Sequence, residues 1–513
     1  MFEGVNNNFF SMLFFYLALS LLVGCANDTS KDLSESVKKD LRDHNNFTAD
    51  NEEVATIKRL KTICADRFAD WTKAAELGIP DGQVLLAICY HYGATVPVDH
   101  KESVKWLHKA AENEYMDAQY SLGMLYFYGE CVPEDMAEVH KWIRKAADQG
   151  HADAQYMLGW CYFNGVGVHE DDAEAVRWLR KSAEQDNADA QYILGQCYFN
   201  GVGVHEDDAE AVKWWRKSAE QNNAEAQYVL AGYYGVDTDI TENYVEAIAW
   251  LCKSAEHGHA KAQYCLGGSY FEGTGFPVDK IEAVKWVSKA AEQGYVDAQC
   301  LLGWCYFEGT GVPEDKAEAA KWFRKAAKQG NADAQCMLGW CFSEGVGTPK
   351  DKAEAIEWLR KAAEQGHVEA QVRLGGCYFD GIGVSKNDLE AVKWWYKAAE
   401  QGNDDAQVRL GGCYFEGFGV PENKSEAVKW ARKAAEQGNI DAMARLSICY
   451  FHGFGIPEDK TEAIRWLQKA AELGHTDAQY TLGNCYLEGI GVPKDGMEAT
   501  RWFRKAESQG IRK

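Results

Sequence analysis

The sequence predicts an all-α solenoid built from two-helix repeats. A tryptophan recurs every 36 residues along most of the 513-residue chain. With each tryptophan recur two stretches of apolar residues at helical spacing, joined by a glycine-rich turn. A unit of this size cannot bury its apolar face alone, so consecutive units are expected to stack. The tryptophans are Trp106, Trp142, Trp178, Trp214, Trp250, Trp286, Trp322, Trp358, Trp394, Trp430, Trp466 and Trp502.

The chain divides into four parts in this interpretation. We expect a signal peptide at 1–24, a polar lipidated tether at 25–50, a partial N-terminal repeat at 51–80 and twelve full repeats at 81–512. A solenoid grows by adding layers, so its length does not require several globular domains.

The amino terminus has the features of an exported lipoprotein. Residues 12–23 form an apolar run that is short for a bilayer span and has the length of a signal-peptide core. It leads into "LVGC", Leu22–Cys25, which resembles the lipobox of bacterial lipoproteins; this resemblance implies cleavage before Cys25 and lipidation of that cysteine. We therefore expect the chain at the bacterial cell envelope, held by its lipid at the outer membrane on the periplasmic or surface face. Because no lysine or arginine precedes Met12, an uncleaved short anchor or an accidental apolar run stays open as the alternative.

Each repeat begins with an amphipathic helix, here called helix A. In the repeat that starts at Asp153, Ala154, Leu158 and Tyr162 fall on one face at helical spacing. The small Ala154 allows a neighbouring helix to approach closely. Gly165 follows as a left-handed C-cap that ends the helix.

A second amphipathic helix, helix B, completes the repeat. Asp171 and Glu174 form a predicted capping box at its start, and every repeat has Asp or Asn at the first position and Glu at the second. Trp178 and Leu179 lie on its apolar face. We expect the tryptophan column to be an aromatic core between successive layers.

The sequence "DAQYMLGWCYFNGVGVHEDDAEAVRWLRKSAEQ", which begins at Asp153, resembles the Sel1-like repeat (SLR), a relative of the tetratricopeptide repeat. The resemblance implies a right-handed superhelix that acts as an adaptor or scaffold for other proteins, in several bacterial members at the host interface. The repeat at Glu225 has "YYGVDTDITENY" where the glycine turn belongs, and we expect an irregularity there. Glu114, Asp186 and Asn222 replace the glycine that ends helix B, so those turns are also expected to differ.

Charge and motif content limit the function. The formal net charge of −24 and the pI near 5.0 argue against nucleic acid as a partner and against charge-driven docking to an anionic membrane. No H-E-x-x-H, P-loop or G-x-S-x-G motif occurs, so we expect no enzyme, no cofactor and no metal. We expect a monomeric scaffold that binds a protein partner. A cell-envelope enzyme or carbohydrate-modifying factor with a groove site, and an intracellular scaffold, stay open as alternatives.

Nine of the 16 cysteines occupy one column of helix A. Equivalent positions in stacked repeats lie roughly 10 Å apart, beyond the Cα separation of about 7 Å that a disulfide tolerates, so this column is expected to be buried and unbridged. Cys252 and Cys265 differ, because they flank one inter-repeat turn almost symmetrically and could form a disulfide. His257 and His259 share that turn, but the spacing disfavours a zinc tetrahedron. The column contains Cys89, Cys161, Cys197, Cys305, Cys341, Cys377, Cys413, Cys449 and Cys485.

A candidate partner site lies on the face of helix A opposite its core residues. The fourth, fifth, eighth and twelfth positions of each repeat fall together there by helical spacing. In stacked helix pairs of the family that the chain resembles, this face lines the concave surface. It carries tryptophans, which often anchor protein partners, and a row of arginines suited to carboxylates. The alternative is that the arginines pair with Glu308, Glu344, Asp380 and Glu416 on a solvated face. The candidate residues are Trp160, Trp304, Trp340, Arg373, Arg409 and Arg445.

Overall fold

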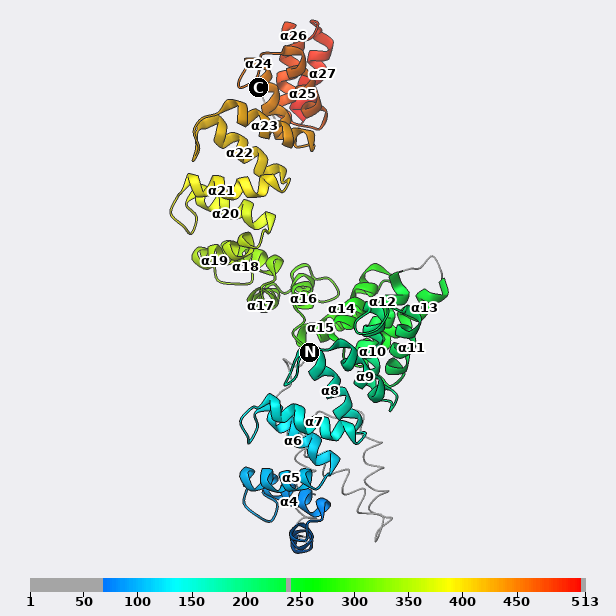
Figure 1. Cartoon of the computed structure of the whole chain (residues 1–513). Helices are drawn as coiled ribbons and strands as arrows, with labels where there is room; N and C mark the ends of the chain where they lie inside the picture. The colour runs from blue at the N-terminus through cyan, green and yellow to red at the C-terminus, as the bar shows by residue number, and fades with distance from the viewer. Residues whose placement is uncertain (1–67, 237–240, 509–513) are drawn as a thin grey trace. The chain divides into compact units, whose positions relative to one another are not determined.

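All regular structure in the described part of the chain is helical, as predicted. The computed structural model describes residues 68–236 and 241–508, in two units divided after His259 (Figure 1). The first unit contains helical residues 68–76 and α4 (Pro80–Tyr92), α5 (His100–Glu112), α6 (Met116–Tyr128), α7 (Met136–Asp148), α8 (Ala152–Asn164), α9 (Asp172–Ala183), α10 (Ala188–Asn200), α11 (Asp208–Glu220), α12 (Ala224–Val236) and α13 (Thr241–Glu256). The second contains α14 (Ala260–Glu272), α15 (Lys280–Glu292), α16 (Val296–Glu308), α17 (Lys316–Lys328), α18 (Ala332–Glu344), α19 (Lys352–Glu364), α20 (Val368–Asp380), α21 (Asp388–Glu400), α22 (Asp404–Glu416), α23 (Lys424–Glu436), α24 (Ile440–His452), α25 (Lys460–Glu472), α26 (Thr476–Glu488) and α27 (Gly496–Ser508).

These helices form twelve consecutive pairs, each made of one helix A and one helix B. Within a pair the two helices pack together, and within each unit helix B also packs against helix A of the next repeat. Each unit is therefore a stack of two-helix layers, and the predicted all-α repeat architecture is confirmed.

Helix A is built as the sequence predicts. In α8, Ala154 and Leu158 have no exposed surface and face the core. His151 caps the N-terminus, because its Nδ1 accepts the N–H of Ala154 at 3.2 Å. Gly165 ends the helix with φ 64°, and its N–H donates to the carbonyl of Cys161.

Helix B starts at the predicted N-cap, but the reciprocal half of the capping box does not form. In α9 the Asp171 carboxylate accepts the N–H of Glu174 at 3.0 Å, as expected. The backbone N–H of Asp171 is already used, because it donates to the Tyr162 carbonyl at 3.0 Å. The Glu174 carboxylate instead accepts the indole N–H of Trp178 at 2.9 Å. The capping-box prediction is therefore wrong in this half.

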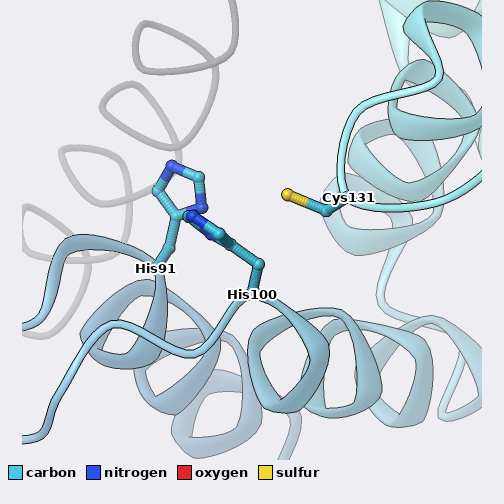
Figure 2. A group of neighbouring side chains, drawn as sticks. All are labelled: His91, His100 and Cys131. Atoms are coloured by element: carbon cyan, nitrogen blue, oxygen red, sulfur yellow. The ribbon is translucent and has the colours of Figure 1, made fainter.

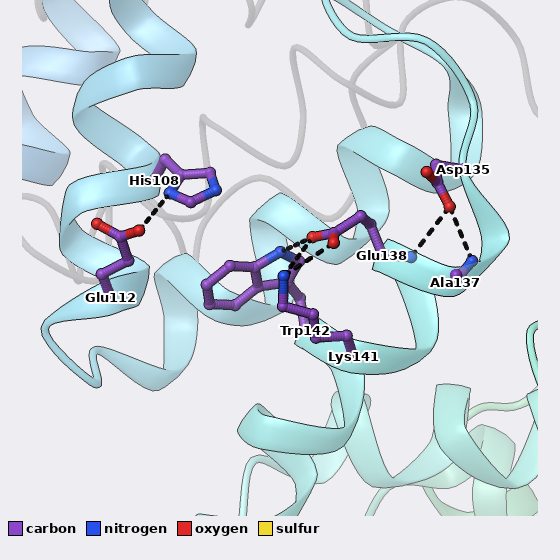
Figure 3. Close-up of polar contacts among 7 residues, drawn as sticks. All are labelled: His108, Glu112, Asp135, Ala137, Glu138, Lys141 and Trp142. Carbon is purple, nitrogen blue, oxygen red and sulfur yellow. Dashed lines mark hydrogen bonds and ion pairs between the residues drawn. The ribbon is translucent and has the colours of Figure 1, made fainter.

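In α7, α9, α13 and α19 the indole N–H of the helix B tryptophan donates to a carboxylate one turn earlier, and a lysine lies near the ring. Figure 3 shows the carboxylate contacts of α7, where Glu138 accepts hydrogen bonds from Trp142 Nε1 at 2.7 Å and from Lys141 Nζ at 2.8 Å. The ammonium of Lys145 lies 4.6 Å from the Trp142 ring centroid, which is a cation–π contact. Every repeat has a lysine at this place, 3.6–4.6 Å from its own tryptophan ring. Nine of the twelve tryptophans are buried, which confirms the predicted aromatic core.

A buried glutamine of helix A connects three consecutive helices. In α18, Gln335 is 4% exposed and its Nε2 donates to the Ala327 carbonyl of α17 at 3.0 Å. Its Oε1 accepts a hydrogen bond from Gln365 Nε2, directly after α19, at 2.7 Å. Eleven of the twelve repeats have glutamine at the position of Gln335. The exception is Met443, and there Leu473 replaces the glutamine that would donate to it. Sequence analysis did not single out this glutamine ladder.

The repeat at Glu225 is irregular, as expected. Helix α13 begins at Thr241 and has 16 residues, whereas α9 has 12 and the other B helices have 13. Asn243, a predicted N-cap, therefore lies inside α13, and this one N-cap prediction is wrong. Residues 237–240 of the turn lie outside the described residues.

The turns after helix B keep a left-handed residue whether or not it is glycine. Gly150 has φ 97°, and Glu114, Asp186 and Asn222 have φ values of 61°, 63° and 69°. The last three turns therefore differ from the glycine turns by a smaller positive φ and keep the left-handed conformation. Each non-glycine residue adopts it at a cost of about 1 kcal/mol, which the packing of the flanking helices offsets.

The cysteine column is buried, as predicted, except at the half-buried Cys377. Cys161 and Cys197 have free thiols, and burial raises the pKa of each to about 12. These thiols are protonated at neutral pH and act as small apolar core residues. Free thiols are also found at the equivalent Cys305, Cys341, Cys377, Cys413, Cys449 and Cys485.

The predicted signal peptide, the tether and most of the partial repeat lie outside the described residues. Across residues 68–236 and 241–508, no helix combines the length and the apolar character that crossing a bilayer requires.

Candidate protein-binding face

The three predicted tryptophans lie on A helices and are half-buried. Trp304 (α16) and Trp340 (α18) belong to neighbouring repeats of the second unit. The Phe307 ring contacts both edge-to-face, with centroids 5.7 Å from Trp304 and 5.6 Å from Trp340. In the first unit, Trp160 makes the same contact with Phe127 at 5.4 Å. The structure thus brings Trp304 and Trp340 together and leaves Trp160 in a separate unit.

Glycines in the tryptophan column show that this face is open. Gly268 and Gly376 stand where other repeats have tryptophan, and a Cβ on either would have no heavy atom within 4 Å. The preceding glycine in each helix faces the core: a Cβ at Gly267 would lie 2.6 Å from the Val287 side chain. At Gly268 and Gly376 the eighth position of the repeat therefore faces open space, whereas Ile88 and Met124, at this position in the first two repeats, are buried.

A cleft of about 590 Å³ opens on this face of the second unit. Its walls come from α14 and α16, and Trp304 and Gly268 both line it. The cleft exists where α14 has glycine in the tryptophan column, because a tryptophan at position 268 would fill it. Other lining residues include the apolar Tyr264, Phe271 and Leu301 and the acidic Glu272 and Glu308.

The cleft chemistry favours recognition over catalysis. Cys305 lines it, but burial raises the pKa of this thiol to about 11, so it is protonated at neutral pH and is a poor nucleophile. The charged lining residues, Glu272 and Glu308, are both acidic. Such a cleft fits an apolar side chain with a basic group beside it.

The predicted arginines are exposed and lie in three consecutive repeats of the second unit, on α20, α22 and α24. Arg373 pairs with Glu369 at 2.7 Å, and Arg409 pairs with Asp405 at 2.8 Å. Each acid lies one turn earlier in the same helix. These two arginines therefore do not form the alternative pairs with the acids at the twelfth position of the repeat. The paired side chains are 41–51% exposed, so the pairs contribute little and leave the guanidinium groups accessible. Arg445 is exposed on α24.

Two other predicted sites stay predictions. The lipidation site Cys25 lies outside the described residues. Cys252 on α13 and Cys265 on α14 are half-buried and fall in different units, so their disulfide is untested. His257 lies 2.8 Å from Gln227 Oε1 and takes the place of a ladder glutamine.

The sequence analysis missed one cluster of chemically reactive side chains. His91, His100 and Cys131 place their donor atoms within 4.8 Å of one another. Burial, together with the neighbouring His100, lowers the pKa of His91 to about 4, so that ring is neutral at neutral pH. Their sequence spacing matches no metal-binding motif, and the available signal was that His91 and Cys131 depart from columns that are mostly phenylalanine and mostly glycine.

Comparison with protein families identifies the repeat. The family model described as Sel1 repeat matches twelve consecutive segments: 80–115, 117–151, 152–187, 188–223, 224–259, 260–295, 296–331, 332–367, 368–403, 404–439, 440–475 and 476–511. The chain belongs to the Sel1 repeat family. This confirms the resemblance and the number of repeats, and a Sel1 repeat array is in general a scaffold for protein–protein interaction.

Solved Sel1 repeat structures are similar to this chain. The crystal structure of c5321, a protective antigen present in uropathogenic Escherichia coli strains displaying an SLR fold, has 37% sequence identity, covers 79% of this chain and 87% of that chain, and has a TM-score of 0.73. A Sel1 repeat protein from Oxalobacter formigenes has 36% identity, covers 58% of this chain and 86% of that chain, and has a TM-score of 0.49. The comparison with curated proteins found no match.

Proposed function

We propose that this Sel1 repeat protein is a non-enzymatic scaffold that binds a protein partner on the helix A face of its second unit. The observation that carries the proposal is the cleft between α14 and α16, because Trp304 lines it and the surrounding face is open. A half-buried tryptophan beside an open cleft is a favourable anchor for a partner side chain.

The glycines of this face support the same proposal. A glycine inside a helix destabilises it by about 1 kcal/mol relative to alanine. Gly267 has a packing reason, since a Cβ there would collide with the core, but Gly268 and Gly376 have none. The two glycines keep space free at a cost in helix stability, and a partner that approaches the backbone closely would use that space.

The charges along the face define the partner chemistry. We expect an extended segment that inserts an apolar side chain with a basic neighbour into the cleft and then presents acidic residues to Arg373, Arg409 and Arg445. Neighbouring A helices are spaced by roughly 10 Å, and an extended chain advances about 3.3 Å per residue, so one contact in every three residues fits. The proposed binding specifies the partner segment of the scaffold and involves no catalytic step.

Two kinds of change test the site: one removes the tryptophans, and the other fills the cleft and leaves the core intact. The double change Trp304→Ala and Trp340→Ala should weaken binding by about 2 kcal/mol. It also disturbs packing, because the Trp304 ring lies 5.7 Å from the ring of the buried Phe323. Gly268→Trp avoids this problem, since the new side chain enters open space.

The matched control is Gly268→Ala, which adds a Cβ and leaves the cleft open. We expect the wild type and Gly268→Ala to retain the same partner from an extract of the native cell or its host, and Gly268→Trp to lose it with an unchanged or raised thermal midpoint. Equal retention by all three proteins would place the partner site elsewhere and contradict the proposal.

We also propose that a lipid on Cys25 holds the scaffold at the bacterial envelope, in contact with a host. The lipobox-like "LVGC" supports the anchor. The similarity to c5321, which is described as a protective antigen, supports exposure to a host. Labelling with a fatty acid, described in the Discussion, tests the anchor.

A further inference from the structure

Two histidines and one cysteine from the first two repeats converge on one point (Figure 2). His91 is in the last turn of α4, His100 is the first residue of α5, and Cys131 lies in the turn between α6 and α7. The two imidazole centroids are 5.1 Å apart, and the thiol of Cys131 points toward both rings. Each residue places one nitrogen or sulfur atom within 4.8 Å of the others.

The repeat itself provides an internal comparison for these three positions. The equivalent positions hold Phe127, Met136 and Gly167 one repeat later, and Phe163, Asp172 and Gly203 two repeats later. All three positions therefore depart from the following repeats at the same place. Each departure replaces an apolar residue, a carboxylate or a glycine with a side chain that ligates transition metals.

The backbone of Cys131 shows how unusual this departure is. Cys131 has φ 61°, a left-handed conformation that costs a non-glycine residue about 1–3 kcal/mol. At the equivalent Gly167, a Cβ would lie 2.2 Å from the carbonyl oxygen of Met136, which is the counterpart of His100. Nine of the twelve repeats have glycine at this position, where helix B of the preceding repeat is close, and the first repeat has Thr95 with φ 68°. In the second repeat a thiol occupies this position, directly beside the helix start that carries His100.

We propose that His91, His100 and Cys131 bind one divalent transition-metal ion, with zinc as the preferred ion, and that the ion links the first two repeats. Zinc takes imidazole nitrogen and thiolate sulfur at about 2.0–2.3 Å with tetrahedral geometry, so its ligand atoms lie roughly 3.5 Å apart. Binding requires the three donors to move together from their present separation of up to 4.8 Å. Calcium and magnesium prefer oxygen ligands and do not fit this donor set.

Binding follows from ordinary zinc chemistry. The Cys131 thiol loses its proton and coordinates through sulfur, and each histidine coordinates through one neutral ring nitrogen. Three protein ligands leave one coordination position for water or an incoming ligand. Because His91 and His100 belong to the first repeat and Cys131 to the second, the ion would cross-link neighbouring layers of the stack.

Titration of the reduced, metal-free full chain with Co²⁺ tests the site, because a thiolate ligand gives cobalt a charge-transfer absorption in the near ultraviolet. We expect this band to saturate at one equivalent and to disappear when Zn²⁺ displaces the cobalt. Cys131→Gly should abolish the band, and this variant should fold because glycine is the residue of the following repeats. His100→Ala should weaken binding by at least about 10-fold. His169→Ala, which changes an exposed histidine of the third repeat, is the matched control and should bind as the wild type does.

A second measurement separates a specific site from adventitious binding. Zn²⁺ should slow amide hydrogen exchange in α5 and α6 of the wild type and leave exchange in Cys131→Gly unchanged. The proposal is overturned if the wild type shows no thiolate band at one equivalent of cobalt. Equal metal affinity in the wild type and Cys131→Gly would also overturn it.

Discussion

Breaking one rung of the glutamine ladder should loosen the contact between successive repeats locally. Gln335 has two hydrogen bonds that join α17, α18 and α19, and its side chain is almost fully buried. Methionine is the natural replacement to use, because Met443 holds the same place in a later repeat. The change Gln335→Met keeps the volume similar and removes both hydrogen bonds.

The expected free energies follow from the bonds that each change removes. A buried hydrogen bond contributes about 1 kcal/mol net, so Gln335→Met should cost about 2 kcal/mol. Gln365→Leu removes the shared bond and a long bond of 3.4 Å from Gln365 Nε2 to the Lys361 carbonyl, both at an exposed side chain, and should cost about 0.5–1 kcal/mol. The double change removes the two bonds of Gln335 and the long, exposed bond from Gln365 to Lys361, and should also cost about 2 kcal/mol. The coupling energy of the pair is therefore about 0.5–1 kcal/mol.

Amide hydrogen exchange measured by mass spectrometry suits a repeat array, because each layer opens with its own free energy. Protection at the facing ends of α17, α18 and α19 should fall by roughly 30-fold in Gln335→Met, and the distant α26 should not change. Additive effects of the two single changes, or protection within twofold of the wild type in Gln335→Met, would refute this reasoning. The pair Met443→Gln and Leu473→Gln should restore the missing rung and raise protection in α24.

Three further predictions test other parts of the account. His151→Asn should remove a pH dependence from the stability of α8. Burial lowers the pKa of His151, so the stability that this side chain contributes is present above pH 6.5 and is lost as the pH falls below 6.5. The asparagine that caps the same helix in neighbouring repeats does not titrate. Exchange protection of α8 measured against pH checks this, and an equal pH dependence in the variant would contradict it. Cys25→Ser should abolish incorporation of labelled fatty acid, and unchanged labelling would contradict the interpretation of Leu22–Cys25 as a lipobox. Thiol counting on the folded full chain should find no more than about two disulfides, with Cys252 and Cys265 as the first candidates, and five or more would contradict the repeat geometry.

The sequence was sufficient for the fold because the same physical signals recur in every layer. The spacing of Ala154 and Leu158 predicted which side of helix A is buried, and the column of Gly165 predicted its left-handed end. The capping box failed in one half because its backbone donor is used by Tyr162, a residue of the preceding helix. That competition depends on how the turn folds back, which local sequence does not show.

The candidate site was predictable only in part. Helical spacing placed the exposed Arg373 and the half-buried Trp304 away from the core face of helix A, since that placement depends on one helix alone. The cleft depends on a pair of residues in successive repeats, Gly268 and Trp304, and became visible only in three dimensions. The ligand cluster of His91, His100 and Cys131 was missed for the same reason, because it forms across two layers.

Oxidative footprinting of the partner complex tests the central claim most directly. Hydroxyl radicals modify accessible side chains, so a residue covered by the partner reacts more slowly in the complex than in the free protein. We predict slower oxidation of Trp304 and Tyr264 at the cleft and no change at Met497, which is 84% exposed on helix α27. Unchanged oxidation at the cleft together with protection of the B helices would contradict binding on the helix A face.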